Sequence, residues 1–532
     1  MTTPDSSDRR MLIGSVAGVA GIAALAAMSK AGPLNPPAGA VASTGKTLTG
    51  VEPRIDLNAS VGSSGVTTNG TWEFIISQPG SYYLSASIAT AKSGAILINA
   101  ADVTLDLNGF RVTRASSSGG TGISIGAGCD GAAVFNGSIS GFSTSGIGYD
   151  ASTPPRGCVV RAVRVRNCGN GIDVAEAAIV ESCTAVNCGI GIITRKGSAI
   201  ARCTVENATS AAIGGDIACT LVACSVIGGG SGVSSGAAIS TSYACVLESC
   251  TVSGFNGGSG ITTGRGSVLS NCSVIQNIVT FGINIGECST ATNCVASANT
   301  ALGVPTFAGG IITASNCVLE RCTASQNTGT LTSNGIYCDT GCTVVGCTAN
   351  GNGGQGIQVA AGNVSDCTAS GNHYDGLHGT DRSSFTNCVA RGNGSSGVYA
   401  NYVATIRGCV LAFNNGGILV DGGGGGEIAG NQCEENGNNS TLLGFGIRAQ
   451  GPFVRIKDNH CYANWRNIEV VNTVGVVVTG NHCGAPGSGN NFNIVSGNKV
   501  GVIVSCPASG AITGNTGGTG LGSTDPTANF SY

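Results

Sequence analysis

Apolar residues return along most of this chain at fixed places within a short repeat. Between Cys183 and Cys409 a cysteine recurs every 20 to 28 residues, with an apolar residue three positions before it and a small apolar residue two positions after it. A repeat of this length predicts one supersecondary unit stacked many times, in which each coil buries the face of its neighbour. The cysteines, taken as position 0 of the repeat, are Cys183, Cys203, Cys224, Cys250, Cys272, Cys294, Cys322, Cys347, Cys367, Cys388 and Cys409.

The inward positions −3, 0 and +2 determine the shape of each coil. Side chains of a flat strand alternate between its two faces, so these three positions cannot all point inward from one strand. The pattern therefore predicts a strand that bends between positions −3 and 0. A further short strand is expected at a Gly-Ile-like pair, which follows position 0 by 9 to 11 residues in most coils.

Asparagine marks the turn after the bend. It stands at position +5 in nine consecutive coils, and it tolerates the left-handed backbone conformation that a sharp turn requires. Stacked amides can also hydrogen-bond to one another, so we expect an asparagine ladder along the solenoid. After Cys409 asparagine also takes position 0, in Asn431, Asn459 and Asn481. The residues at +5 are Asn277, Asn299, Asn327, Asn352, Asn372, Asn393, Asn414, Asn436 and Asn464.

Composition favours a solenoid over several ordinary globular domains. Of the 532 residues, 88 are glycine, 10% are charged and 5% are aromatic, and small residues are what narrow coils hold inside. The formal net charge is −3 and no run of like charge occurs, so we expect neither nucleic acid nor an anionic membrane surface as a partner. We interpret the one local basic group as a solvated coil edge; it consists of Arg156, Arg161, Arg164, Arg166, Arg195 and Arg202.

The first 31 residues resemble a twin-arginine export signal. Arg9 and Arg10 precede a weakly hydrophobic Ala/Gly core and a small-residue cleavage site ending at Ala31. The residues after the arginine pair differ from the usual Phe-Leu-Lys, so a general secretory signal or an uncleaved membrane anchor stays open. The resemblance implies an exported protein, in the periplasm, at the cell surface or outside the cell. We expect residues 32–70 to be a Gly/Pro/Ser-rich lead-in and residues 516–532 a flexible C-terminal tail.

The 25 cysteines would suggest disulfides in an exported protein, but the repeat argues against them. Stacked coils place successive column cysteines roughly 4.8 Å apart with parallel side chains, whereas a disulfide requires Cβ atoms about 3.8 Å apart. We therefore expect most of them to be reduced, buried, small hydrophobic residues. Zinc-type CxxC spacing is absent from the sequence, and we expect neither a metal site nor a cofactor.

Two segments carry a family resemblance. Val103–Phe110 reads VTLDLNGF and Asn136–Phe142 reads NGSISGF, and the cysteine coils follow them. These segments resemble right-handed parallel β-helix repeat proteins of bacteria, which share their architecture with pectate lyases. The resemblance implies an all-β, right-handed parallel β-helix solenoid of about 18 short coils over residues 71–515, with Phe74–Leu84 as an N-terminal cap. This architecture serves lyases, hydrolases, epimerases, adhesins and surface proteins, so it implies no single activity.

One stretch concentrates reactive side chains in a chain that is otherwise poor in charge. His373–Arg382 reads HYDGLHGTDR and contains two of the four histidines, two acids, a tyrosine and an arginine. It is similar to the Asp-Pro-His-Asp region of alginate epimerases, although the proline is absent. Alignment of the coils puts His378 beside Gln358 of the previous coil and Tyr399 of the next, with Tyr402 close by.

Loop lengths predict a groove around this stretch. The coils of Cys294, Cys322 and Asn431 need 17, 14 and 16 residues to reach the Gly-Ile-like strand, and these longer loops are expected to form ridges. The four short coils between them would form the floor of a groove roughly 19 Å wide, around residues 347–420.

We expect this groove to bind or process an extended polysaccharide or cell-surface glycan. Proton transfer is expected from His378 or Tyr399, and Asp375 and Asp381 would orient or neutralise a uronate. If the protein is an enzyme, a polysaccharide lyase, hydrolase or epimerase is expected. The alternative is a non-catalytic surface or envelope protein, a stiff spacer or adhesin, which the scarcity of charge favours. The candidate substrate-binding residues are His373, Tyr374, Arg382, Gln358 and Tyr402.

Overall fold

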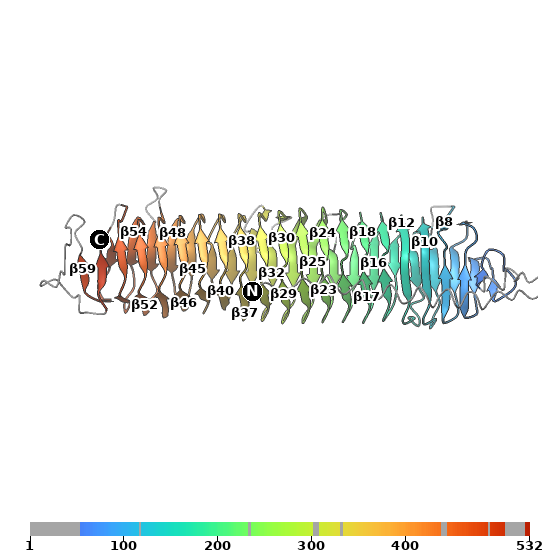
Figure 1. Cartoon of the computed structure of the whole chain (residues 1–532), viewed down its shortest axis with the longest axis horizontal. Helices are drawn as coiled ribbons and strands as arrows, with labels where there is room; N and C mark the ends of the chain where they lie inside the picture. The colour runs from blue at the N-terminus through green and yellow to red at the C-terminus, as the bar shows by residue number, and fades with distance from the viewer. Residues whose placement is uncertain are drawn as a thin grey trace, which may run out of the picture. The chain divides into compact units, whose positions relative to one another are not determined.

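The computed structural model describes residues 54–115, 119–231, 236–301, 308–329, 333–437, 444–487, 490–505 and 527–532. Within these ranges the secondary structure consists of short strands, β1–β60, and contains no helix. The strands wind into a parallel β-solenoid of about 19 turns (Figure 1). The predicted all-β, right-handed parallel β-helix is therefore confirmed, and the predicted number of about 18 coils is close to the observed one. The predicted export signal, residues 1–31, lies outside the described residues.

Most coils consist of three strands, as in the coil of Cys367. β40 (Gly362–Ser365) and β41 (Thr368–Ser370) flank this cysteine, and β42 (Leu377–Gly379) follows after the asparagine turn. The first two strands of successive coils stack into one parallel sheet, called sheet 1, and the third strands stack into a second, called sheet 2 (Figure 1). The predicted bend thus lies at the cysteine, between the two strands that each coil contributes to sheet 1.

The register between coils places equivalent residues one above another. In sheet 2, for example, Ile357 pairs with Leu377, and Leu377 pairs with Val398. Around the candidate site, the remaining strands of sheet 1 are β37 (Cys342–Val345), β38 (Thr348–Asn350), β43 (Ser384–Thr386), β44 (Val389–Arg391), β46 (Ala404–Arg407) and β47 (Val410–Ala412). Those of sheet 2 are β36 (Ser333–Cys338), β39 (Ile357–Val359), β45 (Ser396–Ala400), β48 (Gly416–Val420), β51 (Phe445–Ala449) and β54 (Arg466–Val470).

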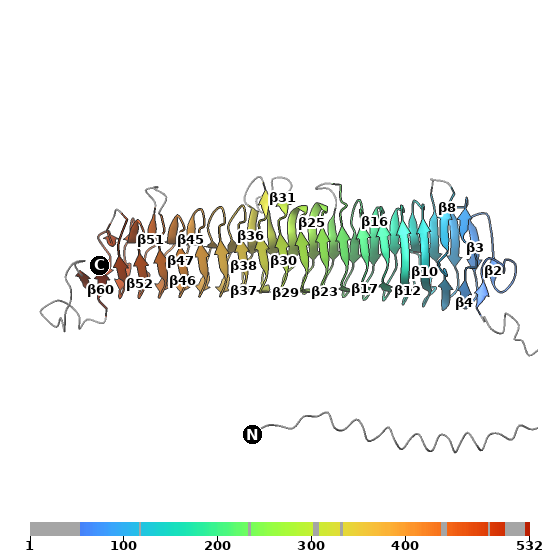
Figure 2. The ribbon, with the colours of Figure 1, turned by 45° about the horizontal axis from the view of Figure 1, so that its top comes forward.

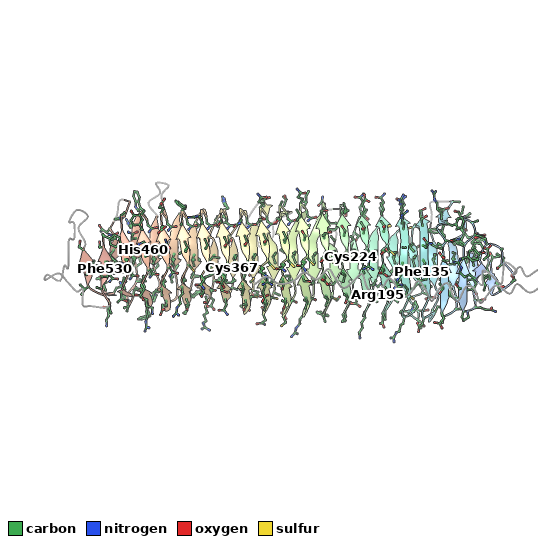
Figure 3. The ribbon with its side chains drawn as sticks, in the orientation of Figure 1. Phe135, Arg195, Cys224, Cys367, His460 and Phe530 are labelled. Atoms are coloured by element: carbon green, nitrogen blue, oxygen red, sulfur yellow. The ribbon has the colours of Figure 1, made fainter. Side chains whose placement is uncertain are left out.

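The cysteine column lies in the core. Every member from Cys183 to Cys409 is at most 1% exposed, and Figure 3 labels two of them, Cys224 and Cys367. Most column thiols lie within hydrogen-bonding distance of the carbonyl at position −3 of the preceding coil; Cys367 Sγ, for instance, donates to Val344 O at 3.6 Å. The 24 cysteines of the described residues are all free, and 23 of them are buried. In this fold the thiol acts as a small core side chain that can also contact a backbone carbonyl.

The expected asparagine ladder is present. Asn372 Nδ2 donates to Asn393 Oδ1 and to Ala349 O, each at 2.9 Å, and Asn372 Oδ1 accepts from Asn352 Nδ2 at 3.0 Å. The same side-chain contacts link all nine predicted residues, from Asn277 to Asn464. These amides are buried and use both their donors and their acceptors, as buried polar groups must. A second ladder runs at position 0 through Asn431, Asn459, Asn481 and Asn529.

The ends of the solenoid differ from its coils. At the N-terminal end β2 (Val66–Thr67) pairs antiparallel with β3 (Trp72–Ile76), while β1 (Ile55–Asp56) pairs parallel with β4 (Gly80–Tyr83) (Figure 2). Strands therefore begin before residue 71. These pairings cover the first edge of the sheets, which would otherwise be open to a second chain.

At the C-terminal end the chain returns to sheet 1. β60 (Asn529–Ser531) pairs with β56 (His482–Gly484) and β59 (Ile503–Ser505), and residues 506–526 lie outside the described residues. Phe530 stacks on His482 with ring centroids 4.7 Å apart, and Figure 3 labels Phe530 and His460 near this end. The last residues of the segment predicted as a tail thus take part in a sheet.

Candidate functional site

The three residues predicted to align across coils form one row on the outer face of sheet 2. Gln358 of β39 pairs with His378 of β42, and His378 pairs with Tyr399 of β45. Their neighbours along each strand point into the core and are buried, so the row itself faces outward. The alignment predicted from the coil spacing is therefore present in the structure.

Glycine brings the backbone of this row close to the asparagine ladder. A Cβ atom added to Gly376 would lie 2.7 Å from Asn393 Nδ2 and 2.9 Å from Ala390 Cβ, so a side chain at this position would clash. The Gly of each Gly-Ile-like pair therefore makes room for a ladder amide. In the coil of Cys367, Asp375 directly precedes Gly376, and this close approach keeps Asp375 near the backbone and buried.

Asp375 orients His378. His378 Nδ1 and Asp375 Oδ2 lie 2.9 Å apart, and Asp375 Oδ1 accepts a hydrogen bond from the Ser396 amide, also at 2.9 Å. The Asp375 side chain is 9% exposed and that of His378 is 16% exposed. With an ionised Asp375, which can only accept hydrogen bonds, His378 donates from Nδ1, and Nε2 is the ring nitrogen not used in this contact. This is the arrangement of a general base held by a buried acid.

Tyr399 lies against the same imidazole. The two rings stack with centroids 4.7 Å apart and an angle of 18° between their planes. Burial raises the pKa of the Tyr399 hydroxyl, and the negative charges of Asp421 and Asp375 raise it further. A proton donor and a proton acceptor therefore stand side by side on one surface.

The stretch His373–Arg382 does not form one cluster, because it spans the full width of sheet 2. His373 and Tyr374 are exposed in the turn before β42, where their rings meet edge to face with centroids 4.8 Å apart. Asp381 and Arg382 are exposed in the turn after β42, at the opposite edge of the sheet. An extended strand separates its ends by more than 3 Å per residue, so residues that are close in sequence lie apart here.

Tyr402 also lies at the edge that follows the third strand of each coil. Tyr402 is 47% exposed, and its ring covers Gly423 of the next coil, where an added Cβ would lie 2.5 Å from Cδ1 of the ring. The structure therefore brings together His378, Asp375, Tyr399 and Gln358, and places Tyr402 apart from them in a turn.

Two further residues extend the row toward the N-terminus and were not predicted. Tyr337 of β36 pairs with Gln358, and burial raises the pKa of its hydroxyl. Asn334 Nδ2 donates to Gln358 Oε1 at 2.7 Å and so fixes the direction of that amide. The register alone could have identified Tyr337, since it occupies the position that Gln358, His378 and Tyr399 occupy in their coils.

On the other side of Tyr399 the row continues through Leu419 to an ion-pair network that was also not predicted. Arg448 of β51 donates from Nε to Glu469 Oε2 at 2.5 Å, and Arg466 also pairs with this carboxylate. Glu469 is 2% exposed; burial alone would raise its pKa, but the hydrogen bond and charge of Arg448, together with Arg466, hold that pKa below its ordinary value. Arg448 also lies 4.2 Å above the ring centroid of Phe445.

The ridges predicted beside this row fall largely on residues 302–307, 330–332 and 438–443, which lie outside the described residues. In the part of the chain that the structure describes, no group of three or more His, Cys, Asp or Glu side chains could hold a metal ion. No helix of membrane-spanning length and apolarity occurs in the same ranges.

The parallel coils, the two stacked sheets and the outward polar row define a right-handed β-helix protein. The chain belongs to the family described as "Right handed beta helix region", whose model matches residues 210–364 and 360–516, more than half of the sequence. No curated protein sequence matches this chain.

Solved structures similar to the chain include β-helix proteins of several kinds. The Dettilon tailspike protein (gp208) is 10% identical, with a TM-score of 0.29, over 70% of this chain and 62% of that one. The periplasmic alginate epimerase AlgG is 10% identical, with a TM-score of 0.30, over 63% and 76%. The A-module of the Azotobacter vinelandii mannuronan C-5 epimerase AlgE4 is 14% identical, with a TM-score of 0.19, over 79% and 91%. This chain thus spans less than two thirds of the tailspike protein, and no activity is taken from these likenesses.

Proposed function

We propose that this exported protein binds an extended polysaccharide along the outward row of sheet 2 and acts on it through His378 and Tyr399. The observation that carries the proposal is the contact among three side chains: a buried carboxylate, Asp375, holds the imidazole of His378, on which Tyr399 stacks. A stiff solenoid fixes the positions of these groups, as proton transfer requires.

The row offers the surface that a sugar chain needs. Tyr337, Gln358, His378 and Tyr399 place three rings and one amide in a row across four successive coils. The rings of His378 and Tyr399 stack on each other and so present their edges outward, where the phenol hydroxyls and the Gln358 amide can bond the hydroxyl groups of a sugar. A chain bound along the solenoid axis would cross these side chains one after another.

Among a lyase, a hydrolase and an epimerase, the geometry favours a lyase. Glycoside hydrolases generally use two carboxyl groups on either side of the scissile bond, whereas the Asp375 carboxylate is already bound to His378 and Ser396. Epimerisation needs protons on opposite faces of the sugar ring, whereas His378 and Tyr399 reach it from one surface. In an elimination, His378 Nε2 would take the proton beside the uronate carboxylate and Tyr399 would protonate the leaving glycosidic oxygen. The C–H and C–O bonds break and a carbon–carbon double bond forms.

The roles predicted for the edge residues belong to the same proposal. Arg382 supplies a cation in the turn after β42 that could neutralise a uronate carboxylate, and Asp381 beside it could orient a sugar hydroxyl. His373, Tyr374 and Tyr402 would contact the glycan from the two edges of the sheet.

The test uses the mature chain and a panel of acidic and neutral polysaccharides, with unsaturated product followed by ultraviolet absorbance and new reducing ends counted in parallel. Asp375→Asn is expected to lower turnover by about 100-fold or more, because His378 loses the acceptor that fixes its tautomer. The matched control is Asp366→Asn, the same change on the same coil but at the bend of sheet 1, which should leave turnover unchanged.

The outcomes separate the proposal from its alternative. Formation of unsaturated product that depends on Asp375, His378 and Tyr399 supports the lyase. Binding without product would remove the catalytic part of the proposal. A chain that neither binds nor cleaves any member of the panel would overturn it and favour a stiff spacer or adhesin.

A further inference from the structure

The basic group of six arginines between residues 156 and 202, predicted to be a solvated coil edge, divides into two parts in the structure. Four of its six arginines are neutralised by acids on their own or neighbouring coils. Figure 3 labels one of these, Arg195, near the edge of the coils. The ion pairs join Arg156 with Glu176, Arg161 and Arg202 with Glu181, and Arg195 with Asp173. Arg164 and Arg166 have no ion pair within the described residues.

A third arginine joins these two from an earlier part of the chain. Arg111 begins β8 (Arg111–Arg114), and Arg164 and Arg166 end β12 (Val159–Arg166). Between them in sheet 1 runs β10 (Ala133–Ser140), whose register pairs Ser138 with both Arg111 and Arg164. Two coils thus carry arginine on either side of a coil that carries serine.

These side chains line a cavity of about 270 Å³ on the outer face of sheet 1. Ser138 and Ser140 alternate with the buried Ile139, so both hydroxyls face the cavity between the flanking guanidinium groups. Arg111 likewise forms no ion pair in the described part of the chain. Along sheet 1, Arg166 pairs with Val186 and Val186 pairs with Glu206. The acid in this row therefore lies two coils from Arg166, with the coil of Val186 between them. The lining residues are Arg111, Ser138, Ile139, Ser140, Arg164 and Arg166.

Three like charges around one small cavity repel each other unless an anion lies among them. Elsewhere on this surface arginines pair with carboxylates one coil away, as Arg161 does with Glu181 and Arg195 with Asp173. No such carboxylate pairs with the arginines of this cavity in the described residues, so the positive charge here is concentrated. Guanidinium and hydroxyl groups are the donors that bind phosphate and sulfate groups in proteins.

We infer that this cavity is a binding site for a tetrahedral oxyanion, a sulfate or phosphate group. The donors are not coplanar: Arg111 lies on one side, Arg164 and Arg166 on the other, and the two serines form the floor. Oxygens that point in several directions suit such a set, whereas a carboxylate is matched by a single planar fork. The site lies on sheet 1, many coils from His378, so the test of anion binding is independent of the test of the proposed activity.

The anion can come from two sources, and the binding experiment separates them. Inorganic sulfate, inorganic phosphate and a sulfated oligosaccharide are each titrated into the mature chain by calorimetry, with thermal stabilisation as a second readout. Tighter binding of the oligosaccharide than of the free ions identifies a sulfated glycan as the ligand. Equal binding identifies the free anion.

The variants Arg111→Gln and Arg164→Gln are each expected to weaken binding by about tenfold or more, as the loss of a charge-assisted hydrogen bond would. The matched control is Arg455→Gln, which removes the same charge from an exposed strand position outside the cavity. Without anion, Arg164→Gln should melt no lower than the parent, because it removes repulsion and breaks no ion pair.

Three results would overturn the assignment. The first is no binding of any of the three probes at physiological ionic strength. The second is equal weakening by Arg455→Gln, which would show a general effect of charge. The third is an oligouronate that binds as tightly as the sulfated oligosaccharide, which would assign the site to carboxylates.

Discussion

Asn481 Nδ2 donates to Asn529 Oδ1 at 3.0 Å, although 48 residues separate the two along the chain. The backbone N–H of Asn481 donates to the same oxygen, also at 3.0 Å, and Asn529 Nδ2 donates in turn to Val478 O at 3.1 Å. Both side chains are fully buried. Asn529 therefore extends the second asparagine ladder and provides the acceptor for the backbone N–H of Asn481, which would otherwise be unpaired.

Replacing Asn529 by alanine should loosen the last coils. The change leaves the buried backbone N–H of Asn481 without an acceptor, which costs about 1–3 kcal/mol, while Asn481 Nδ2 keeps Ile456 O and Thr479 O as acceptors. Amide hydrogen exchange at Asn481 should speed up by about tenfold or more, while exchange at Asn372 stays unchanged, because each coil of a solenoid contacts only its neighbours. The exposed Asn490→Ala variant serves as control. Unchanged exchange at Asn481 would contradict the structural role of Asn529.

A change in the middle of the first ladder should be more severe. Asn372→Ala removes a donor to Asn393 and Ala349 and an acceptor for Asn352, all of which are buried. We expect a loss of about 3 kcal/mol or more in the free energy of unfolding, measured by urea denaturation. The control is Asn415→Ala. Asn415 is exposed and directly follows the ladder residue Asn414, and its replacement should cost less than about 0.5 kcal/mol in the free energy of unfolding. Similar losses for both variants would argue against the ladder as a stabilising element.

The coil could be predicted from sequence because its causes are local. Burial at −3, 0 and +2 is repeated in coil after coil, and only a bent strand can bury all three positions. The +5 asparagines were predictable for the same reason. Asn529 was not predicted, because the repeat was followed only to residue 515 and residues 516–532 were interpreted as a tail.

Contacts across coils were predictable only where the spacing of the coils gave their register. It did so for His378 and Tyr399, but the hydrogen bond from His378 to Asp375 depends on side-chain directions that spacing does not give. The cavity of Arg111 and Arg164 was not predictable, since these residues are 53 positions apart and meet only across β10. The pairing of Arg448 with Glu469 was missed although the two residues are 21 positions apart, the same spacing as His378 and Tyr399, so the register could have identified it.

Thiol reactivity should follow burial. Cys288 is the one exposed cysteine among those described, whereas burial raises the pKa of Cys158 and of Cys168 to about 11 and keeps both thiols protonated. In a Cys506→Ser background, the native protein should react quickly with a thiol reagent at one position, and Cys288→Ser should abolish that reaction. Denaturation without reductant should expose 24 thiols. A count of only a few would show that the column cysteines pair in solution.

Tyr399 should ionise at higher pH than an exposed tyrosine. Its pKa is raised by burial, then by the charges of Asp421 and Asp375. The folded state therefore holds this proton more tightly than the unfolded chain, and the stability that it contributes is lost as pH rises past about 10. An ultraviolet titration compared with that of Tyr399→Phe isolates the transition. Asp421→Asn should lower the pKa, because it removes one of the charges; no change would contradict the assigned cause.

Glu469 should make the solenoid sensitive to acid. Its folded pKa lies below the ordinary value because Arg448 and Arg466 outweigh the effect of burial. A depressed pKa means that the ion pairs contribute stability above the unfolded pKa of about 4.3, and that this contribution is lost as pH falls through the folded pKa. Glu469→Gln should therefore cost about 3 kcal/mol at neutral pH, since Arg448 is left buried without its partner, and much less at a pH where the parent carboxylate is also protonated. Urea midpoints measured at both pH values test this, with the exposed Glu206→Gln as control. A cost that does not change with pH would place the stabilisation in packing and not in the charge of Glu469.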